Sequence, residues 1–418
     1  MREIGLVIAK DIFNTSLYSR LGADIRGSRI DEISNSVANV GRDVISLAPG
    51  CPSPETLPAE ELAQIWEKLI AREGPALFNY ASTTEGEAAL RAFLAEKLRS
   101  EGAALEMENV LITTGGMQGL DLACKLLVEP GDAVLVETPA YSNGLAAIHN
   151  YGGNPCHISG DDEGLLPEAV EEAVMALRRE GRPVKLIYTV PTFQNPGGTT
   201  MPLERRERLL ELARKHSLLI LEDDPYRDLS FYGPPPPSLL SLDSVGGTVL
   251  HVSTFAKNIS PGLRVGWVAA PAGTIRKMAL ARHSMDICTN TPGQKIVTEF
   301  CLSGELERHI QGLIPAYRAR KERMLASLEG RFGGLARWTD PGGGFFIWLT
   351  FDESVSTERL LDFALEEGVA FVPGSAFDAY KKTSNDMRLC FAYPNLEEIN
   401  LGIERLRHAF DRYRDETL

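Results

Sequence analysis

A lysine flanked by hydroxyl-bearing residues and an arginine is the part of this chain best suited to chemistry. Lys257 follows Ser253 and Thr254 closely, and Arg264 comes seven residues after it. Residues 258–263 are mostly small or turn-forming, which predicts a tight loop. An amine forms an imine with an aldehyde, while hydroxyl and guanidinium groups bind a phosphate. This run therefore predicts a site for a cofactor that carries both groups, as pyridoxal phosphate does.

A glycine-rich turn predicts a further part of such a site. Residues 113–119 read TTGGMQG and join a predicted strand at 110–113 to a predicted helix at 117–127. Glycines allow a backbone to approach a ligand closely, and the start of a helix offers free N–H groups to an anion. An ordinary strand–helix connection is the alternative explanation of this pattern.

Polar side chains follow two predicted strands at the edge where open α/β sheets bind ligands. Asn195 precedes a proline after the strand that ends at Val190, and its amide can donate to a phenolate oxygen. Asp223 ends another apolar strand, where a carboxylate can keep a pyridine nitrogen protonated. Tyr226 can reach the ring hydroxyl, and its spacing favours Asp223 over Asp224. The alternatives are an ordinary N-P-G turn and acids that only cap the next turn.

An aromatic and a late arginine complete the candidate set. Tyr141 follows the strand at 133–136 and can stack on the face of a ring, although simple packing explains a loop tyrosine equally well. Arg388 lies inside an apolar strand, and a buried arginine needs an anionic partner. Its planar fork suits a substrate carboxylate, and the alternative is a structural ion pair with an acid.

The pattern of apolar runs predicts a sheet and two domains. Between 109 and 270, short apolar runs alternate with helical patterns, which indicates a mainly parallel α/β sheet covered on both faces. The last third predicts a smaller α+β layer that includes one long helix at 294–328, strands at 369–372 and 387–391, and a final helix at 396–412. We expect a segment at 1–43 packed on the small domain or the mouth of the site, a large domain at 44–286 and a small domain at 287–418.

The composition is that of an ordinary globular protein and limits the classes of partner. The 418 residues are 44% hydrophobic and 24% charged, and the formal net charge is −14. An acidic chain is not expected to bind nucleic acid or an anionic membrane. The six cysteines are scattered and the seven histidines form no metal-binding motif, which predicts a cytoplasmic protein without a metal site.

Taken together, these segments resemble the fold-type I, class I and II pyridoxal-phosphate-dependent aminotransferases over residues 45–418. The order agrees: glycine turn, aromatic, N-P-G-G, D-x-x-Y, S/T-x-x-K, R-x-G and late arginine. The runs PG at 49–50, NY at 79–80, QNPGG at 194–198, EDDPYR at 222–227 and SPGLR at 260–264 are most similar to the 2-aminoadipate and multi-substrate subgroup. That subgroup also supplies the effector half of MocR-type regulators. The resemblance implies a large domain with a mainly parallel seven-stranded sheet and a smaller α+β domain.

The resemblance also implies roles around the cofactor ring. Lys257 is then the imine lysine and proton shuttle, Asp223 pairs with the pyridine nitrogen, and Tyr141 stacks on the ring. Asn195 and Tyr226 bond the ring oxygen. The residues implied to bind the substrate are Arg388, Asn195 and Gly50.

The phosphate contacts are implied in the same way. They are Gly116, Met117, Gln118, Thr254 and Arg264, together with Tyr80, which is expected to reach the phosphate of the partner subunit in a homodimer. Two positions depart from the family pattern. Met117 stands where relatives often have serine or alanine, so it is expected to contribute only its backbone N–H. Ala256 replaces a frequent serine, which leaves Thr254 as the nearer hydroxyl and Ser253 as a weaker candidate.

The function that follows is transfer of an amino group between an L-amino acid and a 2-oxo acid, with 2-aminoadipate-, branched-chain- or aromatic-type substrates. Two alternatives stay open. The same scaffold supports elimination, decarboxylation or oxidation, and the chain also resembles a MocR-like ligand sensor that lacks its DNA-binding domain. The side chains of Tyr18, Asp24, Arg26 and Arg29 are candidates to line the substrate pocket, where a basic residue would favour dicarboxylic substrates. A surface pair of Asp24 with Arg26 is the alternative.

Overall fold

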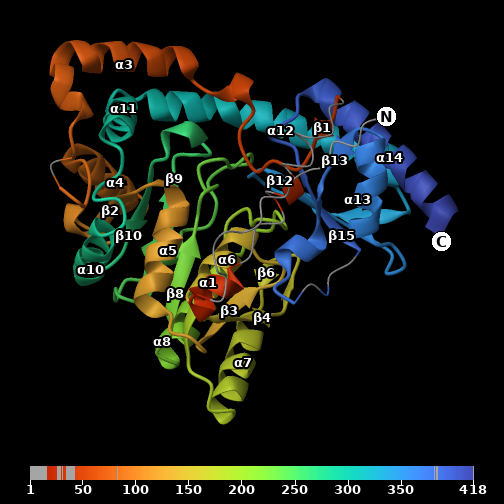
Figure 1. Ribbon diagram of the computed structural model, residues 1–418, viewed down its shortest axis with the longest axis horizontal. Coiled ribbons are helices and arrows are strands. Elements are labelled where there is room, and N and C mark those ends of the chain that lie inside the picture. The colour runs from red at the N-terminus through yellow and green to blue at the C-terminus, as the bar shows by residue number, and fades with distance from the viewer. Residues whose placement is uncertain are drawn as a thin grey trace.

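The structure is a computed structural model that describes residues 17–25, 30, 32–33, 43–81, 83–380, 382 and 385–417. The described chain forms a large lobe built on one sheet and a smaller lobe made by its C-terminal part (Figure 1). Among the described residues, no helix combines the length and the apolar character needed to cross a membrane.

The large lobe is built on a seven-stranded sheet in the order β2-β10-β9-β8-β7-β3-β4. All pairs are parallel except those of β10, which runs antiparallel to β2 and β9. The strands are β2 (Val110–Thr113), β10 (Gly266–Ala269), β9 (Val249–Thr254), β8 (Leu219–Asp223), β7 (Val184–Thr189), β3 (Ala133–Glu137) and β4 (Asn154–Ile158). The predicted fold class is therefore confirmed. The short β10 and the partly polar β4 were absent from the sequence prediction; β4 lacks an apolar run, and β10 directly follows the loop after Lys257.

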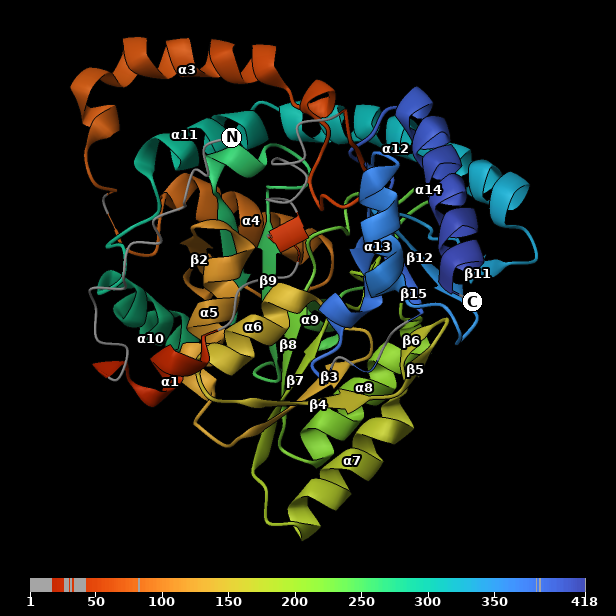
Figure 2. The same cartoon turned by 45° about the vertical axis from the view of Figure 1, so that its right-hand side comes forward.

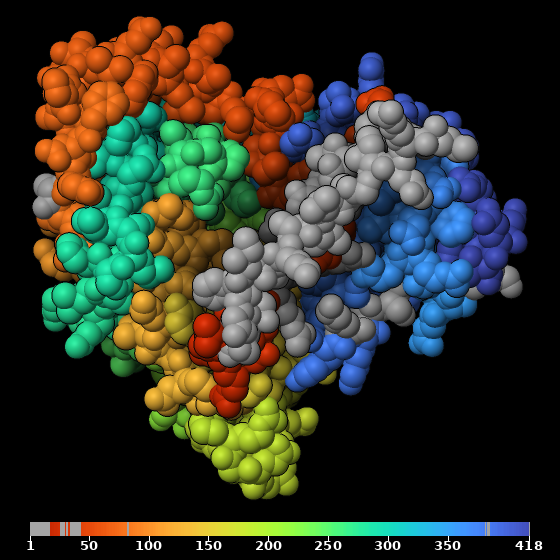
Figure 3. Space-filling model, in the orientation of Figure 1, coloured from red at the N-terminus to blue at the C-terminus, as the bar shows by residue number. Residues whose placement is uncertain are grey.

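Helices cover both faces of this sheet, which explains why its strands are apolar on both sides. One face packs against α5 (Gly115–Leu127), α6 (Ser142–Asn150) and α10 (Ala272–His283). The opposite face packs against α4 (Ala88–Ser100), α7 (Pro167–Arg179), α8 (Leu203–Lys215), α9 (Leu239–Leu242) and α11 (Thr291–Leu302). The helix α3 (Ala59–Glu73) lies over α11 at the top of the molecule (Figure 3).

The small lobe has its own sheet and core. Its sheet has the order β11-β12-β15-β14. The strands are β11 (Ala336–Trp338), β12 (Phe346–Phe351), β15 (Asp386–Cys390) and β14 (Val372–Pro373). The helices are α12 (Glu305–Phe332), α13 (Thr357–Glu366) and α14 (Leu396–Thr417), and α14 packs beside both of the others (Figure 2).

The prediction of one long helix at 294–328 was wrong. The chain forms α11 and α12 instead, separated at Ser303 and Gly304. Gly304 has a φ of 77°, a left-handed conformation that interrupts an α-helix and that glycine adopts readily. The predicted strand at 369–372 is likewise divided, into β13 (Val369–Ala370) and β14.

The segment after residue 43 links the small lobe to the large sheet. Its first strand, β1 (Ile45–Ser46), pairs in parallel with β13. Ile45 and Leu47 belong to the small-lobe core, and the Leu47 carbonyl accepts a hydrogen bond from the Cys390 N–H at 2.8 Å. The chain then continues to Gly50 at the candidate site described below. The three-part domain division stays a prediction, and most of 1–43 lies outside the described residues.

Candidate active site

A cavity of about 210 Å³ lies where the carboxyl ends of the parallel strands meet the small lobe. Its lining includes most of the residues selected from the sequence: Gly50, Gly116, Met117, Tyr141, Asn195, Asp223, Tyr226, Thr254, Lys257, Arg264 and Arg388. These residues come from positions spread over most of the chain. The fold therefore brings together side chains that the sequence only suggested were related.

Lys257 lies just after β9 and points into this cavity. Its Nζ donates to the carbonyl oxygen of Gly50 at 2.6 Å. Burial of the ammonium lowers the pKa of Lys257, since a desolvated charge is disfavoured. The neutral amine is therefore more populated in Lys257 than in an exposed lysine. The neutral amine is the form that attacks an aldehyde or accepts a proton.

Asp223, the last residue of β8, is the acid of this strand end that lines the cavity. Burial raises the pKa of its carboxyl to about 7, although the Tyr188 hydroxyl, which donates to Oδ2 at 3.0 Å, opposes this effect. A cationic partner at the cavity would favour the ionised form. Asp224 points away and accepts a hydrogen bond from Arg227 Nε at 2.6 Å. The choice of Asp223 over Asp224 agrees with this geometry.

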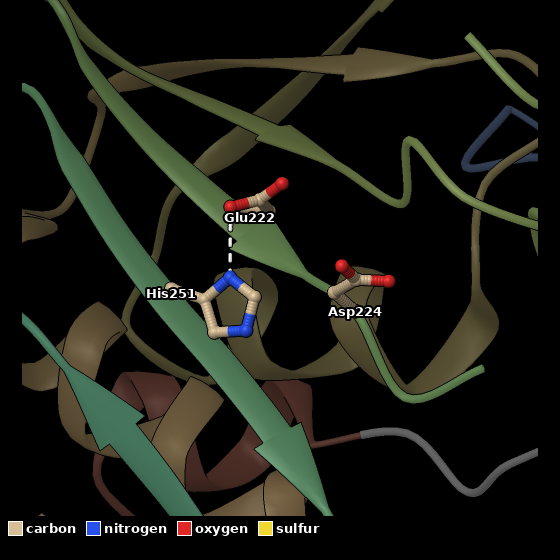
Figure 4. A group of neighbouring side chains, drawn as sticks. All are labelled: Glu222, Asp224 and His251. Carbon is tan, nitrogen blue, oxygen red and sulfur yellow. Dashed lines mark hydrogen bonds and ion pairs between the residues drawn. The ribbon is translucent and has the colours of Figure 1, made fainter. Parts of the chain in front are cut away.

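Glu222 and Asp224, on either side of Asp223, form a buried group with His251 from β9 (Figure 4). His251 Nδ1 lies 2.8 Å from Glu222 Oε2, and the imidazole stacks on Trp267. Burial opposes protonation of His251, but the carboxylate of Glu222 outweighs it and raises the pKa of the imidazole. Glu222 also accepts the N–H groups of Leu239 and Leu240 at the start of α9. Glu222 pairs with His251 and Asp224 Oδ2 with Arg227, while Asp224 Oδ1 is buried without a partner; because each acid already has a cationic partner, we interpret this group as a packing network.

The anion side of the cavity is formed by the start of α5 and by Arg264. Gly115 has a φ of 75°, and a Cβ there would lie 2.5 Å from Arg264 Nη2. The guanidinium of Arg264 therefore crosses directly over the first turn of α5. That turn carries backbone N–H groups without partners inside the helix. A cation beside such N–H groups is an arrangement that binds phosphate.

Arg388, on β15, brings a guanidinium from the small lobe into the cavity. Its side chain is buried, and Nη1 donates to Asn195 Oδ1 at 2.9 Å while Nη2 donates to the Ala48 carbonyl at 2.5 Å. Its Nε is buried without a partner. Within the described part of the chain, Arg388 forms no ion pair with an acid, so the structural ion pair considered from the sequence is not found there. A buried guanidinium with only neutral partners is suited to an anionic ligand.

Comparison with known proteins decides the family. The family model described as aminotransferase class I and II matches residues 42–406. This chain belongs to that family. It is 39% identical to aromatic-amino-acid aminotransferase 1 of Thermococcus litoralis over 93% of each chain, and 36% identical to the 2-aminoadipate transaminase of Thermus thermophilus over 92% of this chain and 94% of that one. A kynurenine aminotransferase structure from Pyrococcus horikoshii, with PMP, superposes with a TM-score of 0.90 at 37% identity over 96% of this chain and 98% of that chain.

The cofactor of this aminotransferase is pyridoxal phosphate, and the donor set fits it. An amine, a carboxylate at a strand end, an arginine over a helix start and a second arginine without an anionic partner all face one cavity. These groups match, in order, the aldehyde, the ring nitrogen, the phosphate and a substrate carboxylate. The residue-by-residue assignment stays a prediction.

Gln118, Tyr80 and the weaker candidate Ser253 do not line this cavity. The carboxamide of Gln118 is bonded to the Thr114 N–H and to Asp286. Tyr80 lies in an exposed segment with 71% of its surface accessible. Ser253, the weaker hydroxyl candidate, donates to the Asp224 carbonyl instead. The Thr254 hydroxyl is engaged by the backbone of Val265 and Ala256, which fixes the turn before Lys257.

Several residues of the site were missed by sequence reasoning. The cavity is also lined by Ile30, Leu120, Asn143, Val190, Pro225 and Ala256. Most of these adjoin recognised motifs, so only their position beside Tyr141, Asn195 or Lys257 could have indicated them. Of the candidates for the substrate pocket, Tyr18 and Asp24 do not line the cavity. Arg26 and Arg29 lie outside the described residues.

Proposed function

We propose that this aminotransferase acts on L-amino acids with large apolar or aromatic side chains and passes their amino group to a 2-oxo acid. Lys257, Asp223 and the ion-unpaired Arg388 face a single cavity, which supports the transfer, and the apolar part of that cavity's lining carries the choice of substrate. The cofactor, when bound, supplies an electron-withdrawing ring conjugated to the substrate Cα. The chain's own residues must then hold the substrate, move its proton and keep the ring charged.

Lys257 is proposed as the group that moves the proton. With the cofactor bound, Nζ would accept the proton from the substrate Cα and later donate it again, so that the amine ends in its starting protonation state. The lowered pKa of the buried amine keeps it available as a base. The Gly50 carbonyl, 2.6 Å from Nζ, can hold the side chain in place while the amine is free.

Arg388 is proposed to bind the substrate α-carboxylate and thereby to set the direction of the Cα–H bond. The free Nε and the nearby Nη groups form a fork that a carboxylate can accept from. Phe346 and Phe377 pack against the guanidinium, at 4.2 and 5.0 Å from the ring centroids. These rings restrict the arginine to one orientation, which favours positioning over mere attraction.

Asp223, Asn195, Tyr226 and Tyr141 are proposed to hold the cofactor ring. The Asp223 carboxylate would pair with the ring nitrogen, and the Tyr188 hydroxyl at 3.0 Å orients that carboxylate. Tyr226 is fixed by edge contacts with Phe346, at 5.8 Å between centroids. A rigid tyrosine and asparagine on one side of the ring would bond its hydroxyl oxygen. The phosphate would lie between Arg264 and the first turn of α5.

The choice of substrate is supported by the lining residues to which no role has been assigned above. Ile30, Leu120 and Val190 are apolar, and Asn143 adds one amide. Apolar surface favours large apolar side chains. The relative named for aromatic amino acids agrees with this choice, and the relative named for 2-aminoadipate suggests a second substrate with a distal carboxylate. Arg26 and Arg29, which could pair with such a carboxylate, lie near Ile30 in the sequence.

The test is a single-turnover experiment with the holoenzyme and a panel of L-amino acids, without a 2-oxo acid. We expect conversion of the cofactor absorbance to that of pyridoxamine phosphate, fastest with phenylalanine, tyrosine or leucine and slower with 2-aminoadipate. If 2-aminoadipate instead converts the cofactor fastest, and an Arg26→Ala, Arg29→Ala double variant loses that advantage, the proposed preference for apolar side chains is wrong. Release of oxo acid without formation of pyridoxamine phosphate would indicate an elimination or oxidation reaction.

We also propose a homodimer in the cytoplasm. Phe78, Tyr80, Met285 and Ile287 are exposed apolar or aromatic side chains, and exposed apolar patches are common at subunit contacts. The six cysteines are all free thiols, which suits a reducing compartment. Sedimentation of the holoenzyme tests the dimer. Mixed dimers of Tyr80→Ala and Lys257→Ala chains should regain activity if Tyr80 serves the partner's site, since one of their two sites has both residues.

A further inference from the structure

An acidic residue between α10 and α11 holds the turn that begins α5. Asp286 Oδ2 accepts hydrogen bonds from the Thr114 hydroxyl at 2.9 Å and from Gln118 Nε2 at 2.7 Å. The other end of the same carboxamide, Gln118 Oε1, accepts the Thr114 N–H at 2.8 Å. Gln118 and Asp286 therefore close a ring of hydrogen bonds around Thr114. Sequence reasoning did not select Asp286.

Asp286 is itself firmly held. Its Oδ1 accepts a hydrogen bond from Arg282 Nε at 2.9 Å, and Arg282 is fully buried. The same guanidinium donates to the carbonyls of Ile112 at 2.5 Å and of Thr84 at 3.1 Å. Arg282 thus ties the end of α10 to strand β2 directly before the glycine turn. Partial burial opposes ionisation of Asp286, but the hydrogen bonds from Arg282, Gln118 and Thr114 outweigh it and lower the pKa of the carboxyl.

The backbone beside Asp286 is strained. Ile287 has a φ of 65°, a left-handed conformation that is unfavourable for a β-branched residue. Such strain persists where surrounding contacts hold the chain in place, and it is concentrated near functional sites. The contacts of Asp286 with Arg282, Thr114 and Gln118 are contacts of this kind.

The placement of the hydrogen bonds has a consequence for the anion site. Thr114 is the N-cap of α5 but its side chain does not cap the helix, and its N–H is consumed by Gln118. The following residues, Gly116 and Met117, line the cavity. The carboxamide of Gln118 is engaged by Asp286 and Thr114 and does not line the cavity. The charge of Asp286 is matched by that of Arg282, so it adds little repulsion toward an anion.

We propose that Asp286 is a positioning residue for the cofactor phosphate, which acts through Thr114 and Gln118 by fixing the first turn of α5 against β2 and α10. Gln118 then serves the phosphate site indirectly, because its carboxamide connects Asp286 to the Thr114 N–H. This inference rests on the proposal that the first turn of α5 and Arg264 hold the phosphate.

The test compares cofactor affinity with and without the phosphate. Cofactor-free wild type and Asp286→Asn protein are titrated with pyridoxal phosphate and with pyridoxal, and binding is followed by absorbance. The amide keeps the size of the acid but turns a donor either toward Arg282 Nε or toward the Thr114 hydroxyl and Gln118 Nε2, which leaves donors unpaired in either orientation. We expect the Kd for pyridoxal phosphate to rise about ten-fold, equivalent to about 1.4 kcal/mol, with a much smaller change for pyridoxal. The ³¹P resonance of the bound phosphate should also shift.

The matched control is Asp121→Asn. Asp121 lies on the same helix and also accepts a hydrogen bond, from the Tyr151 hydroxyl at 3.0 Å, but its carboxylate is not part of the hydrogen bonds that join Asp286, Thr114 and Gln118. Its removal should leave the ratio of the two affinities at the wild-type value. Should Asp286→Asn fail to fold, Thr114→Val removes one of the hydrogen bonds while keeping the shape of the side chain. In that variant we expect the affinity for pyridoxal phosphate relative to pyridoxal to fall, but by less than in Asp286→Asn.

The outcomes separate the two proposals. If Asp286→Asn, or Thr114→Val in its place, weakens pyridoxal and pyridoxal phosphate equally or changes neither, the positioning role is overturned while the phosphate site stands. If wild-type protein binds pyridoxal as tightly as pyridoxal phosphate, the phosphate site itself is misplaced and both proposals fail.

Discussion

The Arg388 guanidinium donates to Asn195 Oδ1 at 2.9 Å although the two residues are 193 positions apart. This bond joins a strand of the small lobe to the N-P-G-G turn of the large sheet. The two groups proposed to bind the substrate carboxylate and the ring oxygen are thereby placed at a fixed separation. A substrate carboxylate that displaces or shares this bond would therefore bind in a way that depends on the relative position of the two lobes.

The role of Arg388 predicts a uniform loss across substrates. Arg388→Ala should lower kcat/KM for every amino acid by a similar factor of about 10²–10³, because loss of one partner of a buried charged pair costs about 2–5 kcal/mol. Steady-state kinetics with phenylalanine, leucine and 2-aminoadipate measures this. Arg337→Ala, which removes an exposed arginine of the same small sheet, is the control. A loss restricted to one class of substrate side chain would show that Arg388 binds the side chain of the substrate and not its α-carboxylate.

From the proposed role of Lys257 we expect that its removal impairs proton transfer and that an external amine partly restores it. Lys257→Ala should bind the cofactor but lower the single-turnover rate by at least about 10²–10⁴-fold, the contribution of a positioned general base. Added methylamine should restore part of the rate. Lys321→Ala is the control, since Lys321 is also a buried amine but is bonded to Asp340 and Tyr232 outside the cavity. Turnover at the wild-type rate in Lys257→Ala would remove the central assignment of the site.

The fold class and the residues around the ring were predictable because each signal is local. Lys257, Asp223 and Asn195 follow apolar strands, and a parallel sheet brings the carboxyl ends of its strands to one edge. What could not be predicted depends on contacts between distant segments. Asp286 meets Gln118 across 168 positions, and no motif marks it. The break of the long helix at Gly304 was missed because its apolar pattern continues on both sides.

The buried carboxyl of Asp223 predicts a pH-dependent stability of the cofactor-free protein. Its pKa is about 7 in the fold, against about 3.9 in an unfolded chain. An acid with a raised pKa favours the fold while protonated, so this contribution is complete below about pH 4 and is lost as the pH rises to about 7. Its size is on the order of a few kcal/mol. Glu137, whose pKa burial also raises to about 7, contributes with the same sign.

Urea unfolding of cofactor-free wild type and Asp223→Asn protein at pH 5 and pH 8 isolates the part due to Asp223. The wild type should lose more stability between these two values than the variant does, because the variant lacks the Asp223 contribution while Glu137 and His251 contribute alike in both proteins. Bound cofactor should abolish the difference, since a cationic ring nitrogen favours the ionised carboxylate. Equal pH dependence in both proteins would contradict the assigned environment of Asp223.

Gly115 predicts a combined loss of stability and cofactor affinity. Its φ of 75° disfavours any residue with a Cβ, and a Cβ would lie 2.5 Å from Arg264 Nη2. Gly115→Ala should therefore lower the free energy of unfolding by about 1–2 kcal/mol. It should also push the Arg264 guanidinium off the first turn of α5 and raise the Kd for pyridoxal phosphate. Gly131→Ala separates the two effects, because Gly131 has a φ of 98° with no atom within 4 Å of its Cβ position. That variant should lose stability to a similar extent and keep its affinity, so an affinity loss of equal size in both variants would assign the effect of Gly115 to backbone strain alone.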